Sequence, residues 1–321
     1  MGGKLPPGLT VAFGSGILAA FFYAAVLLGG FGALILGYLA PLPLMAAGLW
    51  QGTAAAVLAS IIGTMLVTLL MQEETGGLVA TLGFLVTSAL PALVVVRQSL
   101  LARTAPDGGL EWYPPGRLML VLAGLGLGGA ALAMVMALGE PGGLEGVIRQ
   151  ALSRMALLIA PGQADALGPD AMWIAPAMPG LVVISWLLMT VVNGALAQGL
   201  LSRFGLNRRP SMRMVDFTLP HWSALAFSLA CAGAVLLEGG PGFAALTVAL
   251  VLGVPFLFAG LAVVHAVARR QKASTALLVA VYLFVFLIGW PIPFLVGLGM
   301  IEQWMGFRAR LAARKPDQED E

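Results

Sequence analysis

Charged residues are scarce in this sequence. Asp, Glu, Lys and Arg together make up 10% of its 321 residues, whereas soluble domains carry about 25%. A water-facing surface of this size needs more polar groups than that, and 60% of the residues are hydrophobic. The composition therefore excludes an ordinary soluble domain. The formal charge of +2 is also too small to indicate nucleic acid binding.

Residues that build disulfides and metal sites are nearly absent. Cys231 is the only cysteine, so no disulfide can form within the chain. The two histidines, His221 and His265, lie far apart in sequence, and the chain contains neither a P-loop nor an HExxH motif. We therefore expect no metal and no cofactor.

Asp, Glu, Lys and Arg are essentially missing from the interior of the long apolar runs described below. Ion-driven carriers and intramembrane hydrolases place such groups inside the bilayer, because charge is moved or developed there. Their absence argues against an ion-driven carrier that works alone. It also argues against an enzyme, so we expect no catalytic residues.

Long apolar runs are what the sequence has in abundance. A helix needs about 20 apolar residues to cross about 30 Å of hydrocarbon. The last run is too long for one crossing and contains Trp290-Pro-Ile-Pro293, so we expect two short helices that meet there. Pro41-Leu-Pro43 is expected to kink the second run without ending it. The runs are 11–28, 31–50, 53–71, 78–96, 118–138, 173–201, 222–237, 243–268 and 274–306.

These runs predict an all-α fold, a single polytopic integral membrane helical bundle over 1–321 with about eight to ten transmembrane helices. We expect the first run to be a retained span, because no clear signal-peptide cleavage site follows it. A cytoplasmic N-terminus and ten crossings put fifteen of the seventeen Lys and Arg residues in the cytoplasm, leaving only Arg149 and Arg154 outside. This asymmetry is the positive-inside pattern. Both termini, including the charged tail 307–321, are therefore expected in the cytoplasm.

The segment 97–117 is predicted to be a cytoplasmic loop. It contains Glu111-Trp112-Tyr113-Pro-Pro-Gly-Arg117. One interpretation is an interfacial anchor, because Trp and Tyr rings suit the headgroup layer. The other is a docking loop for a cytoplasmic partner.

The segment 139–172 is the one long segment expected outside. Between 144 and 160, apolar and polar residues recur at helical spacing, and Glu145 with Arg149 forms a favourable i,i+4 pair. We predict an amphipathic helix here. It either lies flat on the outer surface or forms a lid over an outward-facing cavity.

Small residues line one face of the first run. Ala12, Gly16, Ala20 and Ala24 recur every four residues. Such a stripe lets another helix approach closely in lipid. The partner helix belongs either to the same chain or to another protein.

Few polar residues lie inside the runs. Asn193 is expected near the bilayer midplane, with Trp186 on the same run, and the two residues serve either helix packing or ligand contact. His265 and Glu302 lie toward cytoplasmic ends, where they are either ordinary helix-end residues or part of a polar cluster. That cluster would comprise Glu111, Trp112, Tyr113, Arg117, His265 and Glu302.

Four stretches together resemble a known family. They are similar to the YybS-like family of bacterial predicted membrane proteins (domain of unknown function family 2232), over nearly the whole chain, and point to its alphaproteobacterial branch. The resemblance implies a multi-pass protein of the bacterial inner membrane, in a family without an established function. The stretches are PLPLMAAGLWQG (41–52), EWYPPGR (111–117), GLAVVHAVAR (260–269) and EQW (302–304).

Residues 10–96 more distantly resemble the substrate-binding subunits of energy-coupling-factor vitamin transporters. In those subunits a small-residue stripe on the first helix docks on the coupling subunit, which implies the same role for the stripe from Ala12 to Ala24. The same broad group contains the rod-shape-determining MreD proteins, which are not transporters. This chain is longer by about four spans, and it matches none of the ligand-contacting residues of the vitamin binders.

Two functions of different classes follow. The first is a subunit that binds a small organic solute in a cavity lined by Trp186 and Asn193, and docks on an energising membrane subunit through its first helix. The second is a membrane scaffold or assembly factor. It would bind other proteins through its first helix and its cytoplasmic loops.

Overall fold

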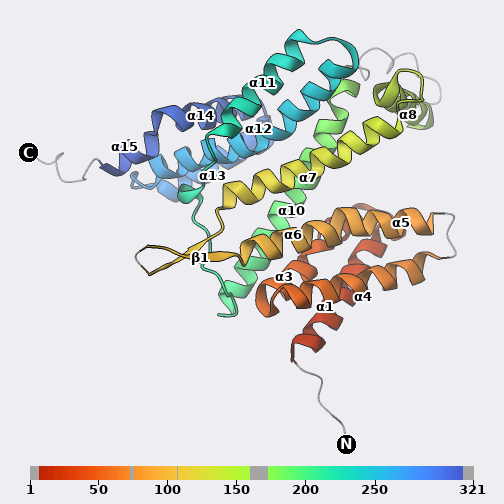
Figure 1. The fold of residues 1–321 in the computed structure, drawn as a ribbon, viewed down its shortest axis with the longest axis horizontal. Coiled ribbons are helices and arrows are strands. Elements are labelled where there is room, and N and C mark those ends of the chain that lie inside the picture. Colours follow the sequence, from red (N-terminus) through yellow and green to blue (C-terminus); the bar gives the residue numbers. More distant parts are fainter. Residues whose placement is uncertain (1–6, 73–75, 107, 160–172, 314–321) are drawn as a thin grey trace, which may run out of the picture. The chain divides into compact units, whose positions relative to one another are not determined.

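The computed structural model describes residues 7–72, 76–106, 108–159 and 173–313. These residues fold almost entirely into helices (Figure 1), which confirms the predicted all-α class. A small two-stranded sheet interrupts the helices. It lies in the segment that we expected to be an irregular loop.

The chain forms two compact units. The first unit takes in residues 10–96 and adds the segment before α7 and most of α10. Two of the three boundaries between the units lie within α7 (Pro115–Met136) and α10 (Met178–Arg203), and the third follows Met212. The first unit consists of Met1–Leu118 and Trp186–Met212, and the second of Met119–Ser185 and Arg213–Glu321.

In the first unit, α1 packs on α3 and α4, and α3 also packs on α6. Gly16 sets the approach of α1 to α4, because a Cβ there would lie 2.5 Å from the carbonyl oxygen of Ala59. The elements are α1 (Pro7–Ala24), η1 (Ala25–Leu28), α2 (Phe31–Tyr38), α3 (Pro41–Gln51), α4 (Thr53–Met71), α5 (Gly77–Phe84), the π-helix η2 (Leu85–Ala89), α6 (Leu90–Ser99), β1 (Ala102–Thr104) and β2 (Leu110–Trp112).

In the second unit, α12 is the central helix and packs on α11 and α14. Gly260 and Gly299 let α12 and α14 touch backbone to backbone, because a Cβ on either would lie 2.0 Å from a carbonyl oxygen of the other helix. The elements are α8 (Gly143–Ile159), η3 (Ala175–Ala177), η4 (Met214–Asp216), α11 (Trp222–Leu236), α12 (Gly239–Ala268), α13 (Ser274–Ile288), α14 (Ile292–Met305) and α15 (Phe307–Ala313).

Ten apolar helices lie at the positions of the ten predicted crossings. Among the described residues, six helices are long and apolar enough to cross a membrane. The other four are shorter, so their crossing of the bilayer remains a prediction. The long ones are Phe31–Gln51, Thr53–Met71, Gly77–Ser99, Pro115–Met136, Ala175–Arg203 and Gly239–Ala268, and the short ones are Gly8–Ala24, Trp222–Leu236, Ser274–Ile288 and Ile292–Met305.

The structure bears out both predictions for the proline-containing turns. The predicted split of the last run is confirmed, since α13 ends at Ile288 and α14 begins at Ile292 after Gly289 at φ 73°. The second run is interrupted at Leu39 and Ala40 but does not end there, as expected, since α2 ends at Tyr38, α3 begins at Pro41, and Phe31–Gln51 together form one helix of membrane length. A proline at the first helical position has no N–H to donate, and this favours a new helix start.

The predicted amphipathic helix is present as α8. The Nε of Arg149 donates to the Oε1 of Glu145 at 3.0 Å, as the i,i+4 spacing predicted. Apolar side chains such as Met155 and Leu158 are exposed on it. Its position on the membrane surface remains a prediction, and residues 160–172 lie outside the described part of the chain.

Candidate functional site

Two consecutive arginines connect the helix ends of the first unit. The last carbonyls of a helix lack intrahelical donors, and they carry a partial negative charge. The Nε of Arg208 donates to the carbonyl of Trp50 at 2.6 Å, in the last turn of α3. The Nη1 of Arg209 donates to the carbonyl of Ser99 at 3.2 Å, the last residue of α6. Arg208 and Arg209 therefore cap two helix C-termini.

Arg209 also fixes the base of a β-hairpin. Its Nη2 donates to the carbonyl of Tyr113 at 3.0 Å, and its guanidinium lies over the ring of Trp112 at 5.9 Å. The hairpin closes where the N–H of Tyr113 donates to the carbonyl of Leu101 at 2.9 Å. The arginine side chain thus joins α6, the hairpin and the start of α7 at one point.

The environment of Arg209 is unusual for a charged side chain. It is only 7% exposed, and in the described part of the chain its hydrogen bonds go to carbonyl oxygens and not to a carboxylate. Burial lowers the pKa of its guanidinium. Carbonyl dipoles and an aromatic face offset part of the desolvation cost. Its own carbonyl accepts from the Nε2 of Gln198 and the Nδ2 of Asn207, so the backbone is held as well.

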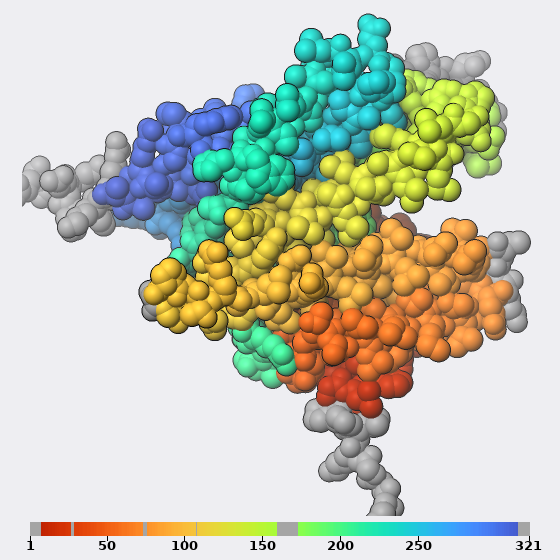
Figure 2. All heavy atoms as spheres, in the orientation of Figure 1, coloured from red at the N-terminus to blue at the C-terminus, as the bar shows by residue number. Residues whose placement is uncertain are grey.

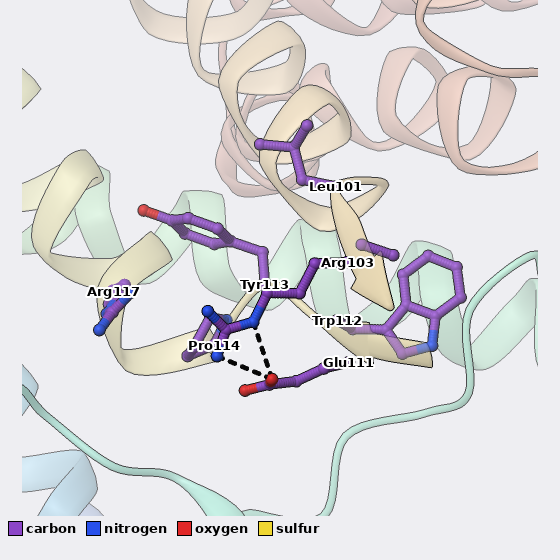
Figure 3. A pocket seen from close by; sticks show the side chains of 8 residues that line it. Leu101, Arg103, Glu111, Trp112, Tyr113, Pro114 and Arg117 are labelled. Atoms are coloured by element: carbon purple, nitrogen blue, oxygen red, sulfur yellow. Dashed lines mark hydrogen bonds and ion pairs between the residues drawn. The ribbon is translucent and has the colours of Figure 1, made fainter. Parts of the chain in front are cut away.

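The hairpin carries a shallow pocket of about 210 Å³ (Figure 3). In its antiparallel register Arg103 faces Glu111, and the two form an ion pair at 2.8 Å. The ring of Tyr113 extends to the side on which Arg117 lies, and Trp112 lies on the other side of the strand. Leu110 is 67% exposed. Figure 2 shows the hairpin segment, in yellow-orange, at the surface of the molecule.

The contacts at this end of the first unit agree with the predicted topology. Alternating crossings put the ends of α3 and α6, the hairpin and the 203–213 segment on one side of the membrane. The bonds of Arg208 and Arg209 bring all four together. The assignment of this side to the cytoplasm remains a prediction, because it rests on the distribution of basic residues.

Trp186 and Asn193, the predicted ligand contacts, both bond backbone carbonyls. The Nε1 of Trp186 donates to the carbonyl of Thr87 at 3.2 Å. Pro91 has no N–H, so this carbonyl lacks its usual helical donor four residues later. The Nδ2 of Asn193 donates to the carbonyls of Tyr38 and Met189, both at 2.8 Å. Both residues thus support helices that are interrupted near a proline.

The stripe on α1 faces the interior of the first unit. Ala12, Gly16 and Ala20 are buried, and Ala24 is half-buried. Gly16 touches α4 of the same chain. This arrangement favours packing within the chain over docking on another protein.

The predicted polar cluster is divided between the two units. Glu111, Trp112, Tyr113 and Arg117 belong to the first unit and lie together around the hairpin pocket. In the second unit, the Nε2 of His265 lies 3.0 Å from the hydroxyl of Tyr282. Glu302 has a different set of partners. The structure thus brings together the four residues of the first unit, and a contact of His265 and Glu302 with them remains a prediction.

Glu302 caps a helix in the second unit. Its side chain is 6% exposed and accepts from the backbone N–H of Phe307 at 2.7 Å and from the Nε of Arg308 at 2.8 Å. The Nη1 of Arg308 donates in turn to the carbonyls of Val215 and Phe217. The carboxylate thus caps α15 and joins it to the η4 segment. This capping role matches the helix-end interpretation of Glu302.

Sequence reasoning missed both Arg209 and the hairpin. Pro106, Gly108 and Gly109 lie between the short segments 102–104 and 110–112. Residues of these types favour a turn, and they would have indicated a hairpin. No local signal marks Arg209, because its partners lie about a hundred residues away in sequence. In the described part of the chain, no group of three His, Cys, Asp or Glu residues could hold a metal ion.

A comparison with known protein families finds a match to part of the chain. A family model described as "Predicted membrane protein (DUF2232)" matches residues 171–302, which is less than half of the chain. The match begins seven residues before α10, ends within α14 at Glu302, and includes α10, α11, α12 and α13. It supports the family resemblance drawn from 260–269, whereas 41–52 and 111–117 lie outside it. No curated protein and no solved structure matches the chain significantly.

Proposed function

We propose that this membrane protein is a scaffold of the bacterial inner membrane, which binds an acidic segment of a cytoplasmic partner through its hairpin. The binding surface, here called the hairpin surface, consists of Arg103, Leu110, Glu111, Tyr113 and Arg117. The chain acts by binding and not by catalysis. The observation that carries the proposal is the anchoring of the hairpin by the buried Arg209.

Anchoring matters because a partner that binds a fixed element loses less conformational entropy than one that must order a loop. The hydrogen bonds of Arg209 hold both the end of α6 and the residue that follows β2. Leu110, at the exposed end of the hairpin, therefore projects from a base whose position is fixed by the hydrogen bonds of Arg209. Such a projecting, partly apolar tip is suited to contact a protein.

The charge around the hairpin selects an acidic partner. Segments 97–117 and 203–212 contain six basic residues and two acidic ones, a net charge of +4. Arg103 is already paired with Glu111, but Arg117 is exposed in the pocket wall. Complementary charge steers association and disfavours basic partners.

Crosslinking from Leu110 tests the proposal. A photoreactive residue at position 110 is expected to form a discrete adduct with a cytoplasmic protein in cells. The double variant Arg103→Glu/Arg117→Glu should abolish the adduct, whereas Lys272→Glu, an exposed charge reversal in the second unit, should leave it. Adducts with phospholipid alone, or a protein adduct that survives the double reversal, would contradict it.

Solute binding is a second candidate, favoured by one observation. The Oδ1 of Asn193 is buried and has no hydrogen-bond partner among the described residues. A solute with a donor group would satisfy it. A ligand from a vitamin and metabolite panel should then raise the melting temperature of the purified protein, and Asn193→Asp should change which ligands do so. A panel without any shift would remove this candidate.

A further inference from the structure

A second surface of the first unit lies away from the hairpin. It is an apolar groove of about 500 Å³ between α4 and the η2–α6 segment, within the usual range of ligand sites, about 300–1,000 Å³. The π-helix η2 forms part of one wall, and such bulges are frequent at functional sites. The groove is lined by Val57, Ser60, Ile61, Thr64, Met65, Thr68, Leu85, Val86, Ala89, Leu90 and Leu93.

Ser60 contributes a polar group to the lining of this groove. Its side chain is 5% exposed, and its hydroxyl has no hydrogen-bond partner among the described residues. The hydroxyls of Thr64 and Thr68, by contrast, donate to the carbonyls one turn earlier. A buried hydroxyl without a hydrogen bond in apolar surroundings destabilises the folded protein. An occupant of the groove with an acceptor oxygen near Ser60 would remove that cost.

The groove differs from the surfaces on which this chain accepts a helix. The two closest of those surfaces are made of small residues, where Gly16 meets α4 and where Gly260 meets α14. The groove walls carry large, exposed side chains such as Ile61, Met65 and Val86. A whole helix, about 10 Å across, would meet these ridges. A single hydrocarbon chain would lie between them.

The length of the groove matches one leaflet. From Val57 to Thr68 the floor extends over twelve residues, whose eleven steps span about 16 Å at 1.5 Å per residue. Half of the hydrocarbon core is about 15 Å. Ser60 lies near the end of the groove that is closer to Thr53, the start of α4. An acyl chain in the groove would therefore place its ester carbonyl at the Ser60 end.

We propose that the groove binds one acyl chain of a glycerophospholipid, whose ester carbonyl accepts a hydrogen bond from the hydroxyl of Ser60. The α4 helix and the η2–α6 segment hold the chain, and the headgroup lies beyond Ser60 toward the end of the unit that carries Arg208. This site is independent of the hairpin surface. It would exist whether or not a cytoplasmic partner binds there.

Ester and ether lipids test the hydrogen bond. Delipidated full-length protein in mild detergent is titrated with dioleoylphosphatidylglycerol or with its diether analogue, which lacks the ester carbonyls. The ester lipid should raise the melting temperature more than the diether lipid. Ser60→Ala should remove that difference while the lipid-free protein melts no lower than the wild type. A difference that persists in Ser60→Ala, or no difference in the wild type, would overturn the assignment.

Matched tryptophan variants test the groove itself. Met65 lines the groove and Leu69, one turn later on α4, does not, although the two are 61% and 59% exposed. Met65→Trp should lose the bound phospholipid in native mass spectrometry, and Leu69→Trp should retain it. Equal retention in both variants would contradict the site. Loss of a dimer in Met65→Trp would replace the lipid by a second copy of the chain.

Discussion

The guanidinium of Arg209 donates to the carbonyl of Ser99, the last residue of α6, at 3.2 Å. This bond links a loop at the end of α10 to a helix that is about a hundred residues earlier in the chain. Together with the bond to Tyr113 it makes one buried side chain responsible for the position of the hairpin. The proposed scaffold function depends on this link.

Replacement of Arg209 by alanine should loosen the hairpin. The carbonyls of Ser99 and Tyr113 would lose a charged donor, which costs on the order of 2–4 kcal/mol in the free energy of unfolding. Limited proteolysis should then cleave within 102–112 faster than in the wild type. Arg103→Ala, on the exposed side of the same hairpin, should leave the melting temperature nearly unchanged. Equal melting temperatures and proteolysis of Arg209→Ala and the wild type would contradict this role.

The packing of α1 on α4 gives a paired glycine test. A Cβ at Gly16 would lie 2.5 Å from the carbonyl oxygen of Ala59, whereas a Cβ at Gly14 would meet no atom within 4 Å. Gly16→Ala should therefore lower the melting temperature by several degrees. Gly14→Ala should leave it unchanged or raise it slightly, because alanine favours a helix. A reversed order would mean that the stripe faces away from α4.

The second unit offers the same test at α12 and α14. Gly260→Ala and Gly299→Ala should each destabilise the protein strongly, because their Cβ atoms would meet backbone carbonyls. Gly297→Ala, on the same helix as Gly299 but with open space around it, is the control. Thermal unfolding in detergent, monitored by the tryptophan fluorescence, compares the three. Wild-type stability of Gly260→Ala would show that α12 and α14 do not touch.

Two ion pairs of the second unit should differ in their contribution to stability. Glu302 is buried with Arg308, whereas Asp216 pairs with Arg213 at the surface. Glu302→Gln should cost on the order of 3 kcal/mol, because it leaves the half-buried Arg308 without its counter-charge. Asp216→Asn should have little effect, since exposed ion pairs are screened by water. Similar melting temperatures for the two variants would contradict a structural role of Glu302.

The sequence was informative wherever a structural feature is local. Apolar run lengths predicted the ten apolar helices, and Trp290-Pro-Ile-Pro293 predicted the break between α13 and α14. The spacing within 144–160 predicted α8, including the pair of Glu145 and Arg149. Each of these features depends on residues within one or two helical turns of one another.

Features that depend on distant residues were not predicted. The hairpin is an exception, because the local turn signal at Pro106, Gly108 and Gly109 was missed; its three-residue strands are too short to show an alternating pattern. The burial of Arg209 and the bonds of Trp186 and Asn193 depend on helix positions that no local pattern specifies. Because Trp186 and Asn193 lie inside apolar runs, the sequence indicated that they form hydrogen bonds within the protein. It did not indicate that the acceptors are carbonyls of helices interrupted near a proline.

Cysteine accessibility tests the central claim most directly, namely that the end of the first unit that carries the hairpin faces the cytoplasm. In a Cys231→Ala background, single cysteines replace Leu110 on the hairpin or Glu140, which is exposed after α7. An impermeant maleimide added to intact cells with a permeable outer layer should label position 140 and not position 110. Position 110 should react only after the inner membrane is opened. Labelling of position 110 in intact cells would contradict both the topology and the proposed cytoplasmic partner.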